Sequence, residues 1–376
     1  MEKTVYLLLE NGQCLEGKSF GAPLDDNGVT GEVVFTTAMT GYLETVTDPS
    51  YYGQIVVQTF PLIGNYGVIP SDFESEKPHL SAYIVREWCR TPSNFRSEGD
   101  LDTFFKEQNI PAVYGIDTRR LTKLLREHGT MNGMLTCENL QEEGTRQRLL
   151  EQIRAYQVRS AVQNASKNIY QEYPLTGARY RVGLWDFGAK ENIVRELRKR
   201  GCWVTVIPAS ASASEIRAMH LNGLMLSNGP GDPQENTGII SELRKLCLST
   251  NLPMFGICLG HQLLALAHGA KTVKLRYGHR GANQPVKELA TGRIYMTSQN
   301  HGYAVESATL PEEAQESFIN LNDGTCEGVC YTDHPAFSVQ FHPEASAGPL
   351  DTGFLFDRLI QMMDQQQEGG NHNAAE

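Results

Sequence analysis

The feature that most constrains this fold is the regular alternation of strand-like and helix-like segments in the second half of the chain. Short apolar runs typical of strands alternate there with amphipathic segments typical of helices. The expected strands are 181–186, 203–207, 223–227 and 254–257, and the expected helices are 190–200, 239–249 and 260–268. This alternation predicts βαβ units, and therefore an α/β fold with a mostly parallel sheet and helices on both faces. A strand at 337–341 and a last helix at 353–363 complete it.

The first half of the chain has a different pattern. Short β-like runs at 5–9, 32–36 and 54–59 are broken by Gly, Pro and Asp turns, and helices are expected at 101–108 and 116–129. A polar segment with a Pro- and Gly-containing connector follows, from about 144 to 176. Because 376 residues suit two cores better than one, we expect three parts. They are a β-rich mixed α/β N-terminal domain with its linker at 1–178, the α/β domain at 179–366 and a disordered tail at 367–376.

Charge and apolar runs limit the partners of the chain. The net charge is −11, from 44 acidic and 33 basic residues, and no stretch concentrates Lys and Arg. Neither a nucleic acid nor an anionic membrane surface is therefore expected as a partner. The sequence has no run of about 20 apolar residues, which a membrane span needs, and no signal-peptide core. We therefore expect a cytoplasmic protein. The eight cysteines are scattered without the spacing of a disulfide framework, so most should be reduced and buried.

One cysteine has a distinctive setting. Cys258 follows an apolar strand, precedes a helix, and is flanked by Gly256 and Gly260 in the pattern G-x-C-x-G. The glycines allow the sharp turn of a nucleophile elbow, which holds the side chain out at the carboxyl end of the sheet. The positive end of the following helix also favours a thiolate there. An isolated cysteine is more often a small buried hydrophobe, so the catalytic interpretation needs partners.

The partners come from the segment FSVQFHPEAS, about eighty residues further on. His342 and Glu344 are two residues apart, and the intervening proline biases His342 toward an extended backbone. In an extended segment residues i and i+2 point the same way, so Glu344 is predicted to orient the imidazole that acts on Cys258. A lone histidine after a strand is usually a structural residue. Beside an elbow cysteine it becomes a candidate base.

A glycine-containing loop supplies the third element. In LSNGPGDPQE, Gly229 and Gly231 follow a predicted strand. Acyl transfer needs donors for the oxyanion of the tetrahedral intermediate, and glycine lets backbone N–H groups approach closely. Taken alone, this loop would be a plain tight turn. Near an elbow cysteine, the loop becomes a candidate source of these donors.

These motifs resemble those of a known family. The loop LSNGPGDP, the elbow GICLGHQ and the segment FHPEA occur in the order found in class I (triad) glutamine amidotransferase domains, over roughly 179–356. The segments WDFGAKENI and QNHGYAV are similar to the small subunit of carbamoyl phosphate synthetase. So are FTTAMTGYLETVTDPSYYGQIVVQTFPLIGNYG and YGIDTRRLT in the first half. The resemblance therefore covers nearly the whole chain apart from the polar tail.

The resemblance implies site residues at matching positions. The catalytic triad falls on Cys258, His342 and Glu344. The positions that contact glutamine fall on Ser50, Gly229, Gly231, Leu259, Gln262, Asn300, Gly302 and Tyr303. Of these, we expect the backbone N–H groups of Gly231 and Leu259 to stabilise the oxyanion. The family often has Phe where Tyr303 stands, which should leave a backbone contact intact.

The resemblance also implies that the overall reaction is divided between two subunits. Glutamine is the substrate, and ammonia passes through a tunnel to a large subunit, where ATP and bicarbonate have formed carboxyphosphate. This chain has no Gly-x-x-x-x-Gly-Lys-Ser/Thr loop, so ATP and Mg are expected on the large subunit, with no cofactor or metal in this chain. The N-terminal half is expected to dock the partner and to lend Ser50. The product serves arginine synthesis, pyrimidine synthesis or both, and small–large heterodimers are possible building blocks of a higher oligomer.

Alternatives remain open beside this interpretation. Cys326, Cys330 and His334 have zinc-like spacing but no evident fourth ligand, and we expect the segment 278–285 at the surface rather than as an anion loop. One functional rival is a stand-alone hydrolase such as a γ-glutamyl hydrolase, against which the N-terminal domain argues. Another is an inactive regulatory or scaffolding homologue, against which the intact triad argues.

Overall fold

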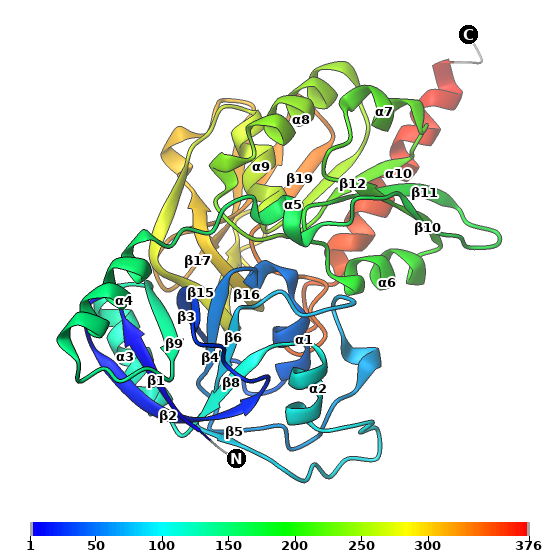
Figure 1. The fold of residues 1–376 in the computed structure, drawn as a ribbon. Coiled ribbons are helices and arrows are strands. Elements are labelled where there is room, and N and C mark those ends of the chain that lie inside the picture. Colours follow the sequence, from blue (N-terminus) through cyan, green and yellow to red (C-terminus); the bar gives the residue numbers. More distant parts are fainter. Residues whose placement is uncertain (1–2, 374–376) are drawn as a thin grey trace. The chain divides into compact units, whose positions relative to one another are not determined.

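The computed structural model describes residues 3–373 and divides the chain into two compact units between Ala161 and Val162. Figure 1 shows both units. The sequence placed the boundary later, at 178. The division therefore falls within the predicted linker, and the part from Val162 onward belongs to the second unit: Val162 lies in that unit's core, and β10 (Gln171–Tyr173) pairs with β12 (Cys202–Pro208).

The N-terminal unit is built on a closed barrel of strand order β1-β2-β8-β6-β4-β3-β9. Parallel pairs join β3, β4, β6 and β8, and the remaining barrel pairs are antiparallel. The strands are β1 (Thr4–Leu9), β2 (Cys14–Gly21), β3 (Val29–Thr36), β4 (Gln54–Gln58), β6 (Ala82–Ile84), β8 (Pro111–Tyr114) and β9 (Met131–Thr136), with β5 (Leu62–Ile63) and β7 (Glu87–Trp88) forming a separate pair. Closure removes the exposed strand edges of a sheet.

Two helices of this unit begin at aspartate caps. The Asp100 side chain accepts from the Thr103 N–H at the start of α2 (Leu101–Glu107), and Asp117 caps α3 (Thr118–His128) by accepting from Arg120. Helices α1 (Tyr42–Thr47) and α4 (Glu143–Ala155) and the 3₁₀ turns η1 (Pro49–Tyr51) and η2 (Pro70–Asp72) complete the unit.

The C-terminal unit contains a ten-stranded sheet of order β10-β12-β11-β13-β14-β19-β18-β17-β15-β16. Its five central strands are parallel to one another, and the outer pairs on both sides are antiparallel. The strands not yet given are β11 (Tyr180–Asp186), β13 (Gly223–Leu226), β14 (Met254–Ile257), β15 (Thr272–Glu288), β16 (Ile294–Val305), β17 (Ala314–Asn320), β18 (Cys326–Tyr331) and β19 (Ala336–Val339). The predicted α/β fold class is confirmed, with the parallel part forming the centre of the sheet.

Helices cover both faces of this sheet, as the alternation predicted. One buried cluster contains apolar side chains of α7 (Ala213–Ala218), α8 (Thr237–Ser249) and α9 (Leu259–Ala267). A second cluster contains those of α6 (Glu191–Lys199) and α10 (Phe354–Asn373), on the opposite face (Figure 1). The unit also contains α5 (Ala161–Ala165), which begins at the division, and the turns η3 (Pro233–Glu235) and η4 (Ser307–Thr309).

The predicted tail differs from what is observed. Sequence composition suggested disorder from residue 367, whereas α10 continues as a helix to Asn373. Buried Leu355, Leu359 and Met363 anchor the helix on the sheet, and its polar end extends from that anchor. Residues 374–376 lie outside the described part of the chain.

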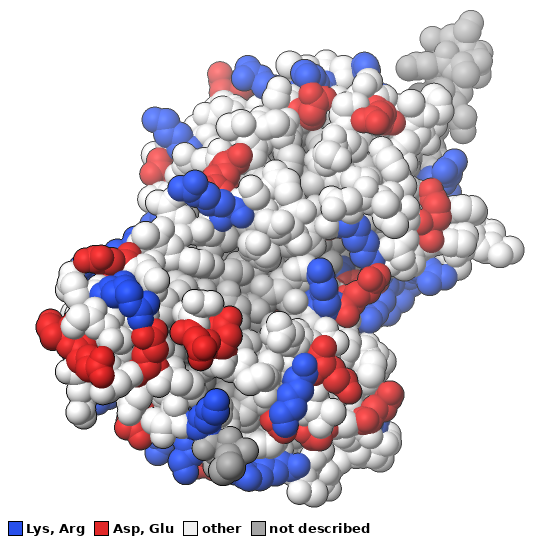
Figure 2. All heavy atoms as spheres, viewed as in Figure 1, with Lys and Arg blue, Asp and Glu red and all other residues white. Residues whose placement is uncertain are grey.

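The surface carries mixed charge. On the face shown in Figure 2, Lys and Arg side chains are interspersed with Asp and Glu, and no broad basic area is visible there. Within residues 3–373 no helix is both long enough and apolar enough to cross a membrane.

Candidate active site

Cys258 sits at a strained turn between β14 and α9. Its backbone has φ 53° and ψ −102°, a conformation that few non-glycine residues adopt. The Cys258 N–H donates to the Val339 carbonyl oxygen at 2.9 Å, which ties the turn to the end of the neighbouring parallel strand. The side chain is 3% exposed. The thiol thus lies at the carboxyl end of the sheet, where the motif predicted it.

The two flanking glycines are required by close packing. A Cβ on Gly256 would lie 2.9 Å from the backbone of Gly260, and a Cβ on Gly260 would lie 2.3 Å from the Leu226 carbonyl oxygen. The Gly260 N–H donates to the Ser227 carbonyl at 2.9 Å, so α9 begins directly against the end of β13. No side chain fits in either gap, which explains the G-x-C-x-G spacing.

His342 and Glu344 form a buried pair. His342 Nδ1 lies 2.7 Å from Glu344 Oε1, and the two side chains are 1% and 0% exposed. The sequence predicted this contact from an extended backbone. The structure instead has a turn, in which the Ala345 N–H donates to the His342 carbonyl at 3.3 Å. The pair forms because the turn folds the carboxylate back onto the ring.

Lys190 is a third member of this cluster. Its Nζ lies 3.4 Å from Glu344 Oε1, and its side chain is 9% exposed. Lys190 stands in the loop between β11 and α6, where its N–H also donates to Asn228 Oδ1 at 3.1 Å. The segment WDFGAKENI contributes to the family resemblance, but the sequence did not predict a role for this lysine.

The charges of the cluster shift its proton affinities. Burial and Lys190 lower the pKa of His342, but Glu344 and Cys258 raise it more, and the balance brings the pKa to about 10. Burial raises the pKa of Glu344, but His342 and Lys190 lower it to about 2. Around neutral pH the imidazole therefore carries a proton, and the carboxylate is charged. Because His342 Nδ1 contacts Glu344, Nε2 is the ring nitrogen left for proton transfer, and the Cys258 thiol is close enough to the ring to help raise its pKa.

The strand β16 brings its predicted residues to the thiol. The Cys258 Sγ lies 3.7 Å from the carbonyl oxygen of Asn300. Gln262, one turn into α9, donates from Nε2 to the Tyr303 carbonyl at 2.7 Å and to Gln340 Oε1 at 2.9 Å. Gly302 lies between Asn300 and Tyr303 on the same strand. Four predicted residues are thus joined to the elbow by direct contacts or by sequence adjacency.

The loop after β13 packs against the start of α9. A Cβ on Gly229 would lie 2.2 Å from the Phe187 carbonyl oxygen and 2.8 Å from Leu259 Cδ2. Gly231 has φ +88°, which favours glycine. Among the described residues, the N–H groups of Gly231 and Leu259 donate to no protein acceptor. They are therefore available to a substrate oxygen.

Ser50 belongs to the other unit. It lies in η1, is 9% exposed, and its N–H donates to Asp48 Oδ1 at 2.9 Å. Its contribution to glutamine binding stays a prediction.

Two further segments considered in the sequence can be located in the structure. Among the described residues, Cys326, Cys330 and His334 form no ligand cluster: Cys326 Sγ faces the Gly328 carbonyl, whereas Cys330 Sγ accepts from Arg358. The segment 278–285, expected at the surface, belongs to β15, and its first residues are buried.

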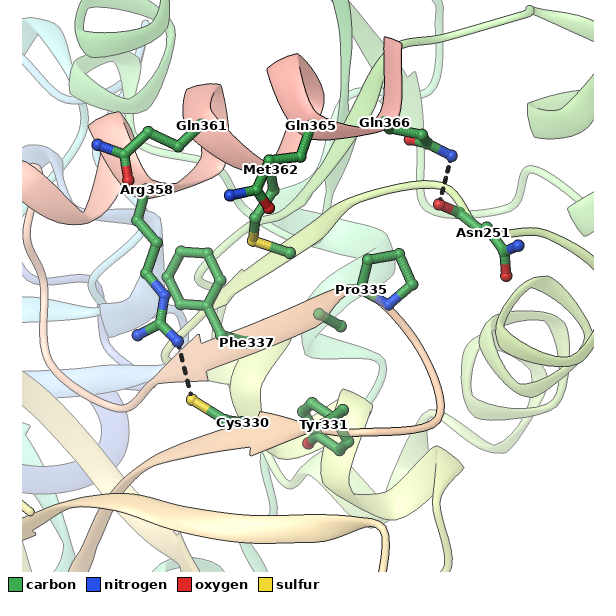
Figure 3. A pocket seen from close by; sticks show the side chains of 11 residues that line it. Asn251, Cys330, Tyr331, Pro335, Phe337, Arg358, Gln361, Met362, Gln365 and Gln366 are labelled. Atoms are coloured by element: carbon green, nitrogen blue, oxygen red, sulfur yellow. Dashed lines mark hydrogen bonds between the residues drawn. The ribbon is translucent and has the colours of Figure 1, made fainter. Parts of the chain in front are cut away.

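A pocket of about 610 Å³ lies at the opposite edge of the sheet from Cys258. Asn251, which precedes β14, and Pro335, which precedes β19, line it, so it faces the amino ends of the central strands. Figure 3 shows the Arg358 side chain beside the Phe337 ring, with the guanidinium carbon 4.6 Å from the ring centroid. This pocket holds none of the predicted site residues.

Comparison with known proteins agrees with both units. Residues 7–135 match the family model described as carbamoyl-phosphate synthase small chain, CPSase domain, and residues 184–362 match glutamine amidotransferase class-I. The carbamoyl phosphate synthase small chain of Listeria monocytogenes serotype 4b is 49% identical over 368 residues, 97% of this chain and 98% of its own length. That of Symbiobacterium thermophilum is 49% identical over 360 residues, 95% of this chain and 98% of its own.

Among solved structures, a glutamine amidotransferase from Thermotoga maritima is similar over 52% of this chain and 85% of its own, with 17% identity and a TM-score of 0.36. The matches to the curated small chains cover both units of the chain and leave only short ends unmatched. The chain therefore belongs to the carbamoyl phosphate synthase small-chain family, whose second domain is a class I glutamine amidotransferase.

Proposed function

We propose that this chain hydrolyses glutamine to glutamate and ammonia through Cys258, His342 and Glu344, and supplies the ammonia to a large subunit that makes carbamoyl phosphate. The observation that carries the proposal is the elbow thiol beside a buried imidazole–carboxylate pair. A structural cysteine needs neither a strained backbone nor a histidine whose pKa is raised to about 10. Family membership supports the same chemistry.

The reaction begins with thiolate attack. Cys258 Sγ adds to the side-chain carbonyl carbon of glutamine, and the oxyanion that forms accepts hydrogen bonds from the N–H groups of Gly231 and Leu259. His342 Nε2 gives its proton to the departing nitrogen, so ammonia leaves and a glutamyl thioester remains. The imidazolium state of His342 supports this step, because the proton is in place before attack.

Hydrolysis of the thioester reverses the role of the histidine. His342 Nε2, now neutral, takes a proton from water as the oxygen adds to the thioester carbon. The tetrahedral intermediate collapses, the carbon–sulfur bond breaks, and glutamate and the Cys258 thiolate are released. Glu344 orients the ring and stabilises its charge throughout, and Lys190 holds the carboxylate in place.

The remaining parts of the proposal concern the partner. ATP, Mg and bicarbonate act on the large subunit, the N-terminal barrel contributes to docking and lends Ser50, and the product serves arginine synthesis, pyrimidine synthesis or both. Gly229, Gln262, Asn300, Gly302 and Tyr303 help to hold the glutamine substrate. A cytoplasmic location and assembly of small–large heterodimers stay predictions.

Glutamate release by the purified chain tests the proposal. The assay is run with and without a large subunit, ATP and bicarbonate, beside Cys258→Ser. We expect hydrolysis that is accelerated when the large subunit, with its substrates, is present, and loss of about 10³-fold or more in Cys258→Ser. Cys202→Ser, which changes a buried cysteine of β12, is the control and should keep the activity.

The outcomes separate the rivals. Absence of glutamate release under every condition would leave the scaffolding interpretation. Fast hydrolysis that no partner affects would favour a stand-alone hydrolase.

A further inference from the structure

A connected set of buried polar side chains lies beside the site and takes no part in the mechanism above. We call it the β18 network; its members are His279, Gln299, His301, Asn320 and Glu327, on strands β15 to β18. Glu327 is 0% exposed, and the other four are at most 7% exposed. A carboxylate buried this deeply is costly unless its oxygens are hydrogen-bonded, so its partners carry information about its role.

Glu327 is held by three side chains. Asn320 Nδ2 donates to its Oε1 at 3.0 Å, and Gln299 Nε2 donates to its Oε2 at 2.9 Å. His279 Nδ1 lies 3.4 Å from Oε1, and the opposite nitrogen of that ring lies 2.8 Å from Asp323 Oδ2, a partly exposed carboxylate. Both oxygens of Glu327 are therefore fixed in place.

The contacts continue from Glu327 to the elbow helix. Gln299 Oε1 lies 3.1 Å from His301 Nε2, and His301 Nδ1 lies 2.8 Å from the Tyr303 carbonyl oxygen. That same oxygen accepts from Gln262 Nε2 at 2.7 Å. One carbonyl is thus held between the His301 ring and the Gln262 carboxamide.

The positions of the protons along this path depend on Glu327. Because the Tyr303 carbonyl only accepts, His301 must carry a proton on Nδ1. In the first possible state, His301 Nε2 also carries a proton and donates it to Gln299 Oε1, and the Glu327 carboxylate balances the charge of the ring. In the second state, that proton is on Glu327, and the Gln299 carboxamide is turned over so that its NH₂ group faces His301 Nε2.

Both states contain the same number of protons. Burial raises the pKa of Glu327 and lowers that of His301, which favours the state with both groups neutral. In either state the proton on His301 Nδ1 stays bound to the Tyr303 oxygen. Without Glu327, Gln299 loses the partner that fixes the orientation of its carboxamide, and the contact between Gln299 and His301 is no longer held in place.

We propose that Glu327 is a positioning residue for glutamine binding, which acts through Gln299 and His301 to fix the Tyr303 carbonyl and, with it, the Gln262 carboxamide. The inference rests on the proposed function, because it assigns Gln262 and Tyr303 to the glutamine site. Neighbouring Asn300 contacts the Cys258 thiol, so the same segment of β16 serves both the nucleophile and the substrate.

The test compares two substitutions at Glu327. Glu327→Ala removes both acceptors and should raise KM for glutamine about tenfold, the effect of one lost polar interaction, while kcat stays within about threefold. Glu327→Gln should restore KM to within about twofold, since its NH₂ group replaces the acid proton toward Gln299 and its oxygen still accepts from Asn320. Val329→Ala, at a fully buried position of the same strand, should lower the melting temperature without changing KM.

A double-mutant cycle tests the path itself. Gln299→Met should raise KM about as much as Glu327→Ala, and the double variant should show little further increase, because both changes break the same connection. Gln299→Met also carries the test if Glu327→Ala does not fold. Additive effects would overturn the proposal, as would equal KM values for Glu327→Ala and Glu327→Gln.

Two further readouts separate this inference from other causes. Glutamine hydrolysis by the unaltered chain tests the proposed function, whereas the ratio of KM values between variants tests the positioning role. The ligand-type atoms of His279, His301 and Glu327 lie within 4.8 Å of one another. A KM that rises with EDTA and recovers with zinc would assign them to a metal and overturn the proposal.

Discussion

The two units differ in what their interiors hold. In the described N-terminal unit, most buried polar side chains are Thr, Ser or Gln, and closure of the barrel leaves its strands paired on both sides. The C-terminal unit buries histidines, carboxylates and a lysine. Within residues 3–373 every buried histidine belongs to this unit: His261, His279, His301, His334 and His342.

This difference follows from the architecture. A closed barrel pairs its strand edges and fills its centre with side chains, so little space remains for charged groups. An open parallel sheet ends in loops at the carboxyl edge, where backbone donors and buried charges can be held around a ligand. The predicted site residues of the C-terminal unit gather at this edge, around Cys258.

The largest effect is expected when the Glu344 carboxylate that contacts the His342 ring loses its charge. Glu344→Gln leaves His342 without its carboxylate, so the pKa of His342 should fall, and kcat for glutamine hydrolysis should drop by about 10²–10⁴-fold. Steady-state glutamate release measures it. Glu242→Gln, on the surface of α8, is the matched control and should keep wild-type kcat. An active Glu344→Gln would mean that the buried pair is structural.

A smaller effect is expected on stability when a glycine of either unit is replaced by alanine. Gly260→Ala would place a Cβ 2.3 Å from a backbone oxygen of Leu226, which cannot move easily, so we expect a loss of about 3 kcal/mol in stability. In the barrel, a Cβ on Gly133 would meet the Val33 side chain at 2.7 Å, and a side chain can rotate away. Gly133→Ala should therefore cost only about 1 kcal/mol.

Urea unfolding measures both glycine variants. Gly238→Ala, where a new Cβ meets nothing within 4 Å, is the control and should be neutral or slightly stabilising. If Gly133→Ala proved the more costly of the two, the backbone at the elbow would be less rigid than the packing around Gly133 in the barrel.

The sequence predicted those features that local rules determine. The helices expected at 101–108 and 116–129, the central strands and the elbow glycines depend on residues close together in the chain, and the structure has all of them. Features that depend on distant pairing were missed. They include the barrel closure between β1 and β9, the Lys190–Glu344 contact and the β18 network, because strand register and long-range contacts are not determined by local spacing.

The pair at the site also predicts how stability depends on pH. The pKa of folded His342 is raised from 6.5 to about 10, so its contribution is complete below pH 6.5 and is lost as pH rises toward 10. The pKa of folded Glu344 is lowered from 4.5 to about 2, so its contribution is complete above pH 4.5 and is lost as pH falls toward 2. The pair should stabilise the C-terminal unit most between these two limits.

Hydrogen exchange resolved by segment measures this effect. The difference in protection between the unaltered chain and Glu344→Gln should be largest at pH 4.5–6.5 and shrink toward pH 10. Segments of the barrel, which contains no part of the pair, should exchange alike in both proteins. A difference that grows with rising pH would mean that His342 is neutral in the folded chain.

The smallest expected effect tests whether a residue of the N-terminal unit contributes to glutamine binding. If Ser50 lends its hydroxyl to the glutamine site, Ser50→Ala should raise KM by about 2–10-fold with kcat nearly unchanged, as expected for the loss of one neutral hydrogen bond. Ser71→Ala, on the exposed turn η2, is the control for the barrel. An unchanged KM would assign glutamine binding to the C-terminal unit alone, so that the barrel's part in catalysis would lie in docking and not in contact with the substrate.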